Sequence, residues 1–131
     1  MLFGALHTSA SGLTLFRTWM DAVSDNIANA NTVRPGSAEA FRARFVIAQS
    51  QETGDVRGVR VGGIALGSGE GRLVHEPDHP MADENGMVRY PDVDMGDQMT
   101  QLIVAQRGYQ MNLAVIDRAK DTYQQALTIG R

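Results

Sequence analysis

Proline is confined to the middle of this chain, and that restriction decides what its two ends can form. All four prolines lie between residues 34 and 94, as do nine of the fourteen glycines. Proline breaks a helix and glycine weakens one. The chain therefore divides along its sequence into residues 1–33, 34–94 and 95–131, and only the first and last of these segments suit long, uninterrupted helices.

Apolar residues recur every seven positions in both end segments, which is the pattern of helices that pair along a narrow stripe. One line in the last segment begins at Met95 and a second begins at Met99. We expect the two helices to pair as an antiparallel coiled coil within one chain. The predicted helix-pair core is Leu6, Leu13, Phe16, Met20, Val23, Ile27, Leu102, Tyr109, Leu113, Ile116, Tyr123 and Leu127.

The middle segment contains several short runs with the alternation of β-strands. They are 41–47, 59–61, 63–66, 73–74 and 87–90, separated by breaks that contain glycine. The dipeptide Asn85-Gly86, just before the last run, is the one preferred in type I′ hairpin turns. The predicted fold class is therefore α+β, with a small antiparallel β-rich domain inserted between the terminal helices.

Composition excludes several classes of protein. The chain has 131 residues, which suits one domain, and it has no cysteine, so disulfides, thiolate zinc sites and cysteine nucleophiles are excluded. The net charge of −3, without a basic cluster, argues against nucleic-acid and anionic-membrane partners. The first sixteen residues lack the basic start and unbroken apolar run of a cleaved signal peptide, and we expect no membrane insertion.

The segment from His75 to His79 spells the H-E-x-x-H motif of zinc metalloproteases. In that motif the two histidines must lie one helical turn apart to meet the same metal. Pro77 and Pro80 oppose a helix here, so the segment is expected to run extended or as turns. The sequence shows no other nucleophile or phosphate-binding motif, and we expect no catalytic or metal residue, no cofactor and no small-molecule substrate.

Few charges lie outside the apolar stripe of the first helix, where the other positions are mostly Ala, Ser, Thr, Asn and Gly. Exposed helices usually carry more charge. This composition favours helices buried in an assembly, and hence a polymerising subunit. The heptads alone equally allow a soluble coiled-coil adaptor or effector that binds a partner helix.

Three stretches resemble the flagellar rod and hook proteins, a family of axial proteins. They are Ser9-Ala10-Ser11-Gly12-Leu13 with Asn26-Ile27-Ala28-Asn29-Ala30-Asn31-Thr32, the run from Leu73 to Val93, and Ala105-Gln106-Arg107-Gly108-Tyr109-Gln110-Met111-Asn112. The family implies a structural subunit of the proximal rod, which polymerises into the drive shaft between motor and hook. It also implies export by the flagellar type III apparatus without a cleaved signal peptide, and partners that are further copies and other rod proteins.

The resemblance also singles out polar positions as subunit contacts or caps: Ser9, Ser11, Asn26, Asn29, Asn31, Arg107 and Asn112. Asparagine at a helix end can satisfy backbone groups. We expect Asn31 to cap the first helix and Asn26 to contact another subunit. Arg107 is either solvated or paired with Asp21 or Asp25 of the same or the next chain.

Overall fold

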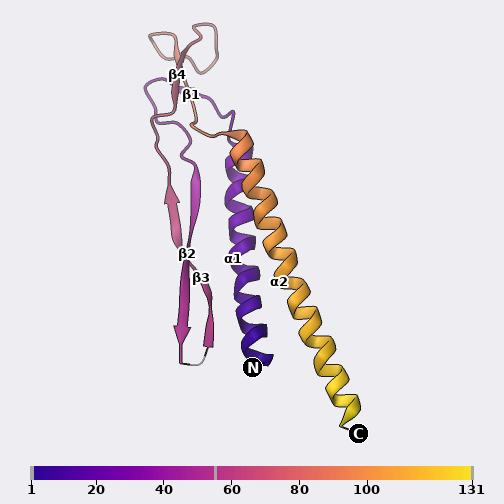
Figure 1. Cartoon of the computed structure of the whole chain (residues 1–131). Coiled ribbons are helices and arrows are strands. Elements are labelled where there is room, and N and C mark those ends of the chain that lie inside the picture. The colour runs from indigo at the N-terminus through magenta and orange to yellow at the C-terminus, as the bar shows by residue number, and fades with distance from the viewer. Residues whose placement is uncertain (1, 55, 131) are drawn as a thin grey trace. The chain divides into compact units, whose positions relative to one another are not determined.

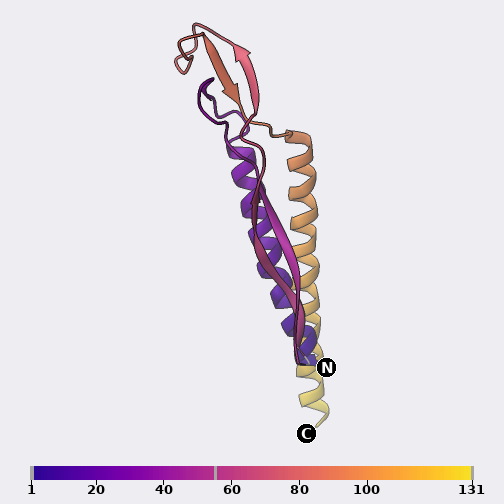
Figure 2. The same cartoon turned by 90° about the vertical axis from the view of Figure 1, so that its left-hand side faces the viewer.

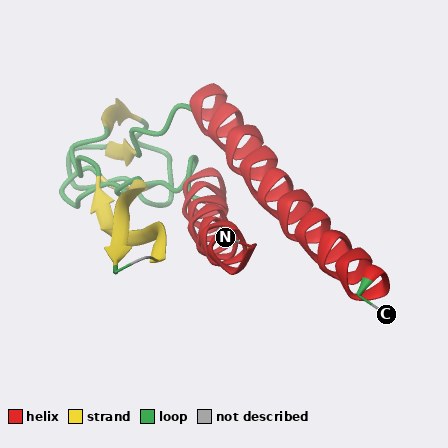
Figure 3. Ribbon diagram, turned by 60° about the horizontal axis from the view of Figure 1, so that its bottom comes forward, coloured by secondary structure: helices red, strands yellow, loops and turns green. Residues whose placement is uncertain are grey.

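The computed structural model describes residues 2–54 and 56–130, and within them lie two long helices and five strands (Figure 1). Helix α1 spans Leu2–Ala28 and helix α2 spans Met95–Ile129. The strands are β1 (Arg34–Pro35), β2 (Arg44–Thr53), β3 (Val56–Leu66), β4 (Arg72–His75) and β5 (Met87–Tyr90). Figure 3 shows the helices in red and the strands in yellow. The predicted α+β class is confirmed.

A polar side chain satisfies free backbone groups at the start of α2, and another does so at the end of α1. The Asp94 carboxylate accepts a hydrogen bond from the Asp97 amide at 2.7 Å, so Asp94 caps the start of α2. After α1, the Asn29 side chain donates to the Asp25 carbonyl at 2.9 Å. The cap of α1 therefore lies at Asn29 and not at Asn31, the position expected from the sequence. Neither described helix is long and apolar enough to cross a membrane.

The chain divides in space into two compact units, and each unit takes part of both helices. Unit 1 consists of Met1–Met20, Val46–Gly63 and Ile103–Arg131. Unit 2 consists of Asp21–Phe45 and Ile64–Leu102. The three segments expected from composition follow the chain, whereas these two units cut across them.

Unit 2 contains a three-stranded antiparallel sheet in the order β1-β5-β4. Val88 of the central strand lies opposite Pro35 on one side and Val74 on the other, and it is 0% exposed. The Arg89 guanidinium, on the central strand, donates to the Gly36 carbonyl at 2.7 Å and also to the Glu70 carbonyl, so it ties β5 to the residue after β1 and to the loop before β4. These contacts give unit 2 an enclosed core.

Strands β2 and β3 form a separate two-stranded ribbon, and in unit 1 this ribbon follows α1 (Figure 2). The Thr8 hydroxyl donates to the Arg57 carbonyl at 2.6 Å, and the Val59 amide donates to the Ser11 hydroxyl at 3.1 Å. A Cβ atom at Gly58 would lie 2.7 Å from that hydroxyl oxygen, so glycine allows the close approach. The hydroxyl groups of Thr8 and Ser11 thus form hydrogen bonds with backbone groups of β3 that could otherwise pair with another strand.

The β region differs from the prediction in two respects. The strands form two sheets and not a single antiparallel unit. Asn85-Gly86 does not form a type I′ turn, which needs positive φ at both central residues, because every positive φ among the described residues belongs to glycine. Gly86 has φ +71°, and its amide closes a turn onto the Asp83 carbonyl at 2.9 Å, while the Asp83 carboxylate accepts from the Asn85 and Met87 amides.

Candidate functional site

In unit 1 the two helices approach each other closely at glycines. A Cβ atom at Gly12 would lie 2.9 Å from the Asn112 carboxamide, and a Cβ atom at Gly108 would lie 2.4 Å from the Phe16 ring. As residue numbers rise along α1 they fall along α2, so the helices run antiparallel in this unit. The Arg17 guanidinium also donates to the Tyr109 hydroxyl at 3.4 Å.

The helices of unit 2 meet through a pair of buried amides. The Asn26 side chain donates to the Gln98 side-chain oxygen at 3.0 Å. Asn26 is 1% exposed and Gln98 is 3% exposed. The expectation that Asn26 contacts another subunit is therefore wrong for this side chain, because its amide is enclosed and bonded within unit 2.

The predicted helix-pair core divides into buried, partly buried and exposed positions. Val23 is buried, and Leu113, Tyr123 and Leu127 are exposed. The remaining members are partly covered: Leu6, Leu13, Phe16, Met20, Ile27, Leu102, Tyr109 and Ile116. Burial of Leu113, Tyr123 and Leu127 against α1 is not found in the single chain.

The buried positions of α2 follow a seven-residue line that differs from the two lines predicted from the sequence. Gln98, Ala105 and Ala119 are buried, and Asn112, on the same line, is partly buried. These residues are small or carry amides, so they allow close approach but do not stand out by hydrophobicity. Their seven-residue spacing was the only signal in the sequence that could have found them.

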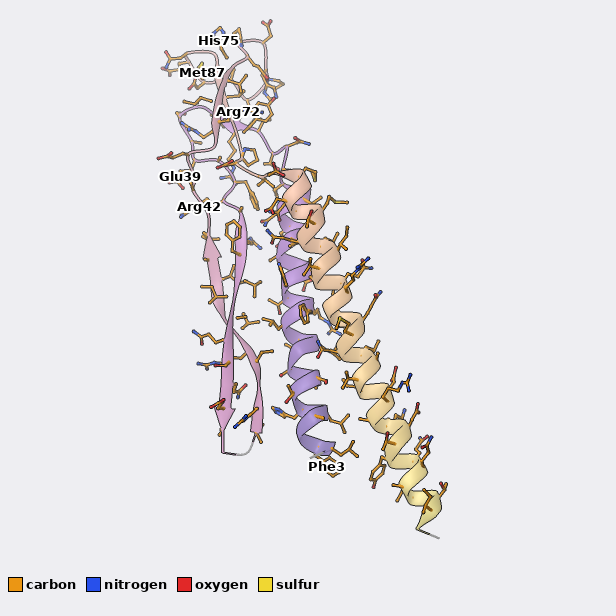
Figure 4. The ribbon with its side chains drawn as sticks, in the orientation of Figure 1. Phe3, Glu39, Arg42, Arg72, His75 and Met87 are labelled. Atoms are coloured by element: carbon orange, nitrogen blue, oxygen red, sulfur yellow. The ribbon has the colours of Figure 1, made fainter. Side chains whose placement is uncertain are left out.

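The large apolar residues of α2 in unit 1 mostly face outward. Met111 is 69% exposed. We call the whole set the outer α2 surface, and it consists of Ile103, Val104, Met111, Leu113, Val115, Tyr123, Leu127 and Ile129. Phe3, at the start of α1, is exposed as well (Figure 4). Large exposed apolar residues that recur along one helix indicate an interaction surface, whereas isolated ones are ordinary. The outer α2 surface is the candidate functional site.

The other predicted polar contacts take several roles. Ser9 is buried, Ser11 receives the Val59 amide, and the Asn112 side chain donates to the Gly108 carbonyl of its own helix at 2.9 Å. Asn31 and Arg107 are exposed. The Asp25 carboxylate lies 2.6 Å from the Arg44 guanidinium, with both side chains about half exposed, and the pairing of Arg107 with Asp21 or Asp25 of the same or the next chain stays a prediction.

The segment that resembles a zinc motif has no helix. His75 ends β4, and the His79 amide then donates to the Glu76 carbonyl at 3.0 Å in a turn, as the two prolines predicted. Glu76 instead accepts a hydrogen bond from the Tyr90 hydroxyl at 3.2 Å. Burial and the Glu76 carboxylate raise the pKa of Tyr90 above its ordinary value of 10.0. Within residues 2–54 and 56–130, no three His, Asp or Glu side chains gather to hold a metal ion.

Comparison with known proteins matches both helices. A family model described as flagella basal body rod protein matches residues 6–35, and one described as flagellar basal body rod FlgEFG protein C-terminal matches residues 84–129. The chain is 34% identical to the flagellar basal-body rod protein FlgC of Yersinia enterocolitica, over 99% of this chain and 98% of that protein. It is 33% identical to FlgC of Bacillus subtilis, over 98% of each chain. Identity to FlgC of Agrobacterium fabrum is 40%, over 92% of this chain and 88% of that protein.

Proposed function

This chain belongs to the FlgC family of flagellar basal-body rod proteins, and we propose that it joins its neighbours in the rod through the outer α2 surface. Its function is structural: it is a subunit of the basal-body rod and not an enzyme. The observation that carries the proposed contact is the exposure of large apolar side chains along one helix of unit 1. Such a surface gains free energy when a partner covers it, at about 25 cal/mol for each Å² of apolar area buried.

The inner contacts of α2 support this division of the helix into two surfaces. Gln98, Ala105 and Ala119 of α2 are buried, whereas the residues of the outer α2 surface are exposed. We infer that α1 and α2 pair in the manner of an antiparallel coiled coil within one subunit, with Gly12 and Gly108 setting the close approach. The larger residues are then free to contact other subunits.

The partners proposed for this surface are further copies of the chain and other rod proteins. Charged residues of both signs, Arg107, Asp117, Arg118, Lys120 and Asp121, lie in the same stretch of α2, so a partner would contact apolar and charged side chains together. We also propose that the chain reaches the rod through the flagellar type III export apparatus, without removal of a signal peptide. In this role it forms part of the shaft that transmits torque from the motor to the hook.

The test is mass spectrometry of detergent-washed basal bodies from the source bacterium. We expect the chain at a stoichiometry comparable to that of other rod components. A Met111→Asp chain should be produced but missing from the basal bodies, whereas Lys120→Ala, at an exposed polar position of the same helix, should be incorporated normally. Absence of the unaltered chain from intact, rod-containing basal bodies would contradict the rod assignment and favour a soluble adaptor that binds a partner helix.

A further inference from the structure

We propose that the buried amides of Asn26 and Gln98 determine the register in which α1 pairs with α2. A heptad pattern repeats itself, so it does not by itself select one alignment of two helices. A buried polar residue can select the alignment, because only one register gives it a partner. Asn26 and Gln98 have the burial and the bonding that this role requires, and the inference goes beyond the surface that unit 1 offers to neighbours.

The Asn26 amide is used almost completely inside unit 2. Its nitrogen donates to the Gln98 side-chain oxygen at 3.0 Å and to the Arg44 carbonyl at 2.9 Å. Its oxygen accepts from the Arg44 amide at 2.8 Å. Both donors and one lone pair are thus satisfied. Asn26 therefore joins α1 to α2 and, at the same time, to the first residue of β2.

The Asn26 side chain donates to the Arg44 carbonyl and accepts from the Arg44 amide. A residue paired with Arg44 from a neighbouring strand would form the same two hydrogen bonds. Aspartate lacks the donors for this exchange, and leucine lacks donors and acceptor alike. The ion pair between Asp25 and Arg44 is about half exposed, so it contributes little selectivity. The specific contact at this junction is therefore the Asn26 amide.

A shift of one heptad would separate the two amides while keeping the repeat in phase. Asn26 would then lie opposite Ala105, or beyond the start of α2 at Met95. In the first case Gln98 would lie beyond the end of α1, and in the second it would lie opposite Trp19. Each buried amide would lose its partner, and we expect this to disfavour shifted registers about tenfold or more.

The experiment uses the purified full-length chain, whose lack of cysteine allows clean labelling. Spin labels are attached at Ser24→Cys and Thr100→Cys, two exposed positions of unit 2, and the distance between them is measured by double electron–electron resonance. A shift of one heptad moves one helix by about 10 Å along the other. We expect one distance in the labelled chain and a second, shifted population when Asn26→Leu and Gln98→Leu are combined.

Two controls separate register from general stability. Asn112→Ala removes an amide that bonds to its own helix, so it should keep the single distance. Gln98→Glu keeps an acceptor for the Asn26 donor and should keep it as well. A single, unshifted distance in the double leucine variant would overturn the proposal, and so would a broad distribution in the labelled chain with both amides present. Neither outcome depends on whether the chain is found in the rod.

Discussion

Units 1 and 2 of this chain use the same two helices in opposite ways. In unit 2 the helices meet at two buried amide side chains. The same unit contains a three-stranded sheet whose central residue, Val88, is fully buried. In unit 1, among the described residues, burial is confined to small side chains such as Ser9, Ala105 and Ala119, while Met111 and its neighbours face outward. The difference fits the proposal that unit 2 encloses a core with its own residues, whereas unit 1 leaves apolar side chains for its neighbours in the rod to cover.

The largest expected effect concerns a buried position of unit 2, where a charged side chain should not be tolerated. Val88→Asp places a carboxylate in the centre of the sheet, at a position that is 0% exposed. We expect the free energy of unfolding to fall by about 4 kcal/mol or more. Urea unfolding followed by circular dichroism measures this loss. A folded Val88→Asp chain of ordinary stability would show that unit 2 is not enclosed.

The same change on the outer α2 surface should act on assembly and not on folding. Met111→Asp alters an exposed residue, so the free energy of unfolding of the isolated chain should change by no more than about 0.5 kcal/mol. Swimming of a strain that relies on this variant should nevertheless be lost, because the charge must be desolvated when a neighbour covers it. Normal motility would remove Met111 from the proposed interface.

A substitution at Gly108 tests the close contact between the two helices in unit 1. Gly108→Ala should favour the helix by itself, but the added methyl would lie 2.4 Å from the Phe16 ring and push it aside. We expect a net loss of about 1 kcal/mol in the free energy of unfolding. Gly4→Ala is the matched control, since a Cβ atom there meets nothing within 4 Å, and this variant should be neutral or slightly stabilised. Equal effects at both positions would contradict close helix contact at Gly108.

The smallest expected effect concerns Tyr90 in unit 2. Because its pKa is raised, the contribution of its neutral hydroxyl to stability is present below about pH 10 and is lost as pH rises through the raised pKa. The difference in stability between the unaltered chain and Tyr90→Phe should therefore shrink at alkaline pH. Unfolding curves of both chains over about pH 8 to 11 measure it. A difference that stays constant would show that the bond to Glu76 is not formed.

The sequence predicted the two helices well, because the absence of proline and the heptad lines are strong local signals. It located most of the strands but not their division into two sheets, which depends on contacts distant in sequence, such as those of Thr8 and Ser11 with β3. The core residues predicted for α2 are partly covered or exposed, and the buried line through Gln98, Ala105 and Ala119 was not predicted. Hydrophobicity does not distinguish a side facing a partner helix in the same chain from a side facing another subunit, and here the inner side carries alanine and amides.

The side chains with which α1 holds the ribbon have a consequence for how the chain behaves before it meets its neighbours. Thr8 and Ser11 occupy backbone groups of β3, and Asn26 occupies those of the first residue of β2. Unpaired strand edges invite pairing between chains, and proteins usually blunt them with charges, prolines or bulges. Here short polar side chains of α1 form hydrogen bonds with backbone groups at the edges of the ribbon. Backbone groups that are already bonded to α1 are not available to a strand of another chain, so we expect these contacts to disfavour edge-to-edge pairing of the ribbon between chains.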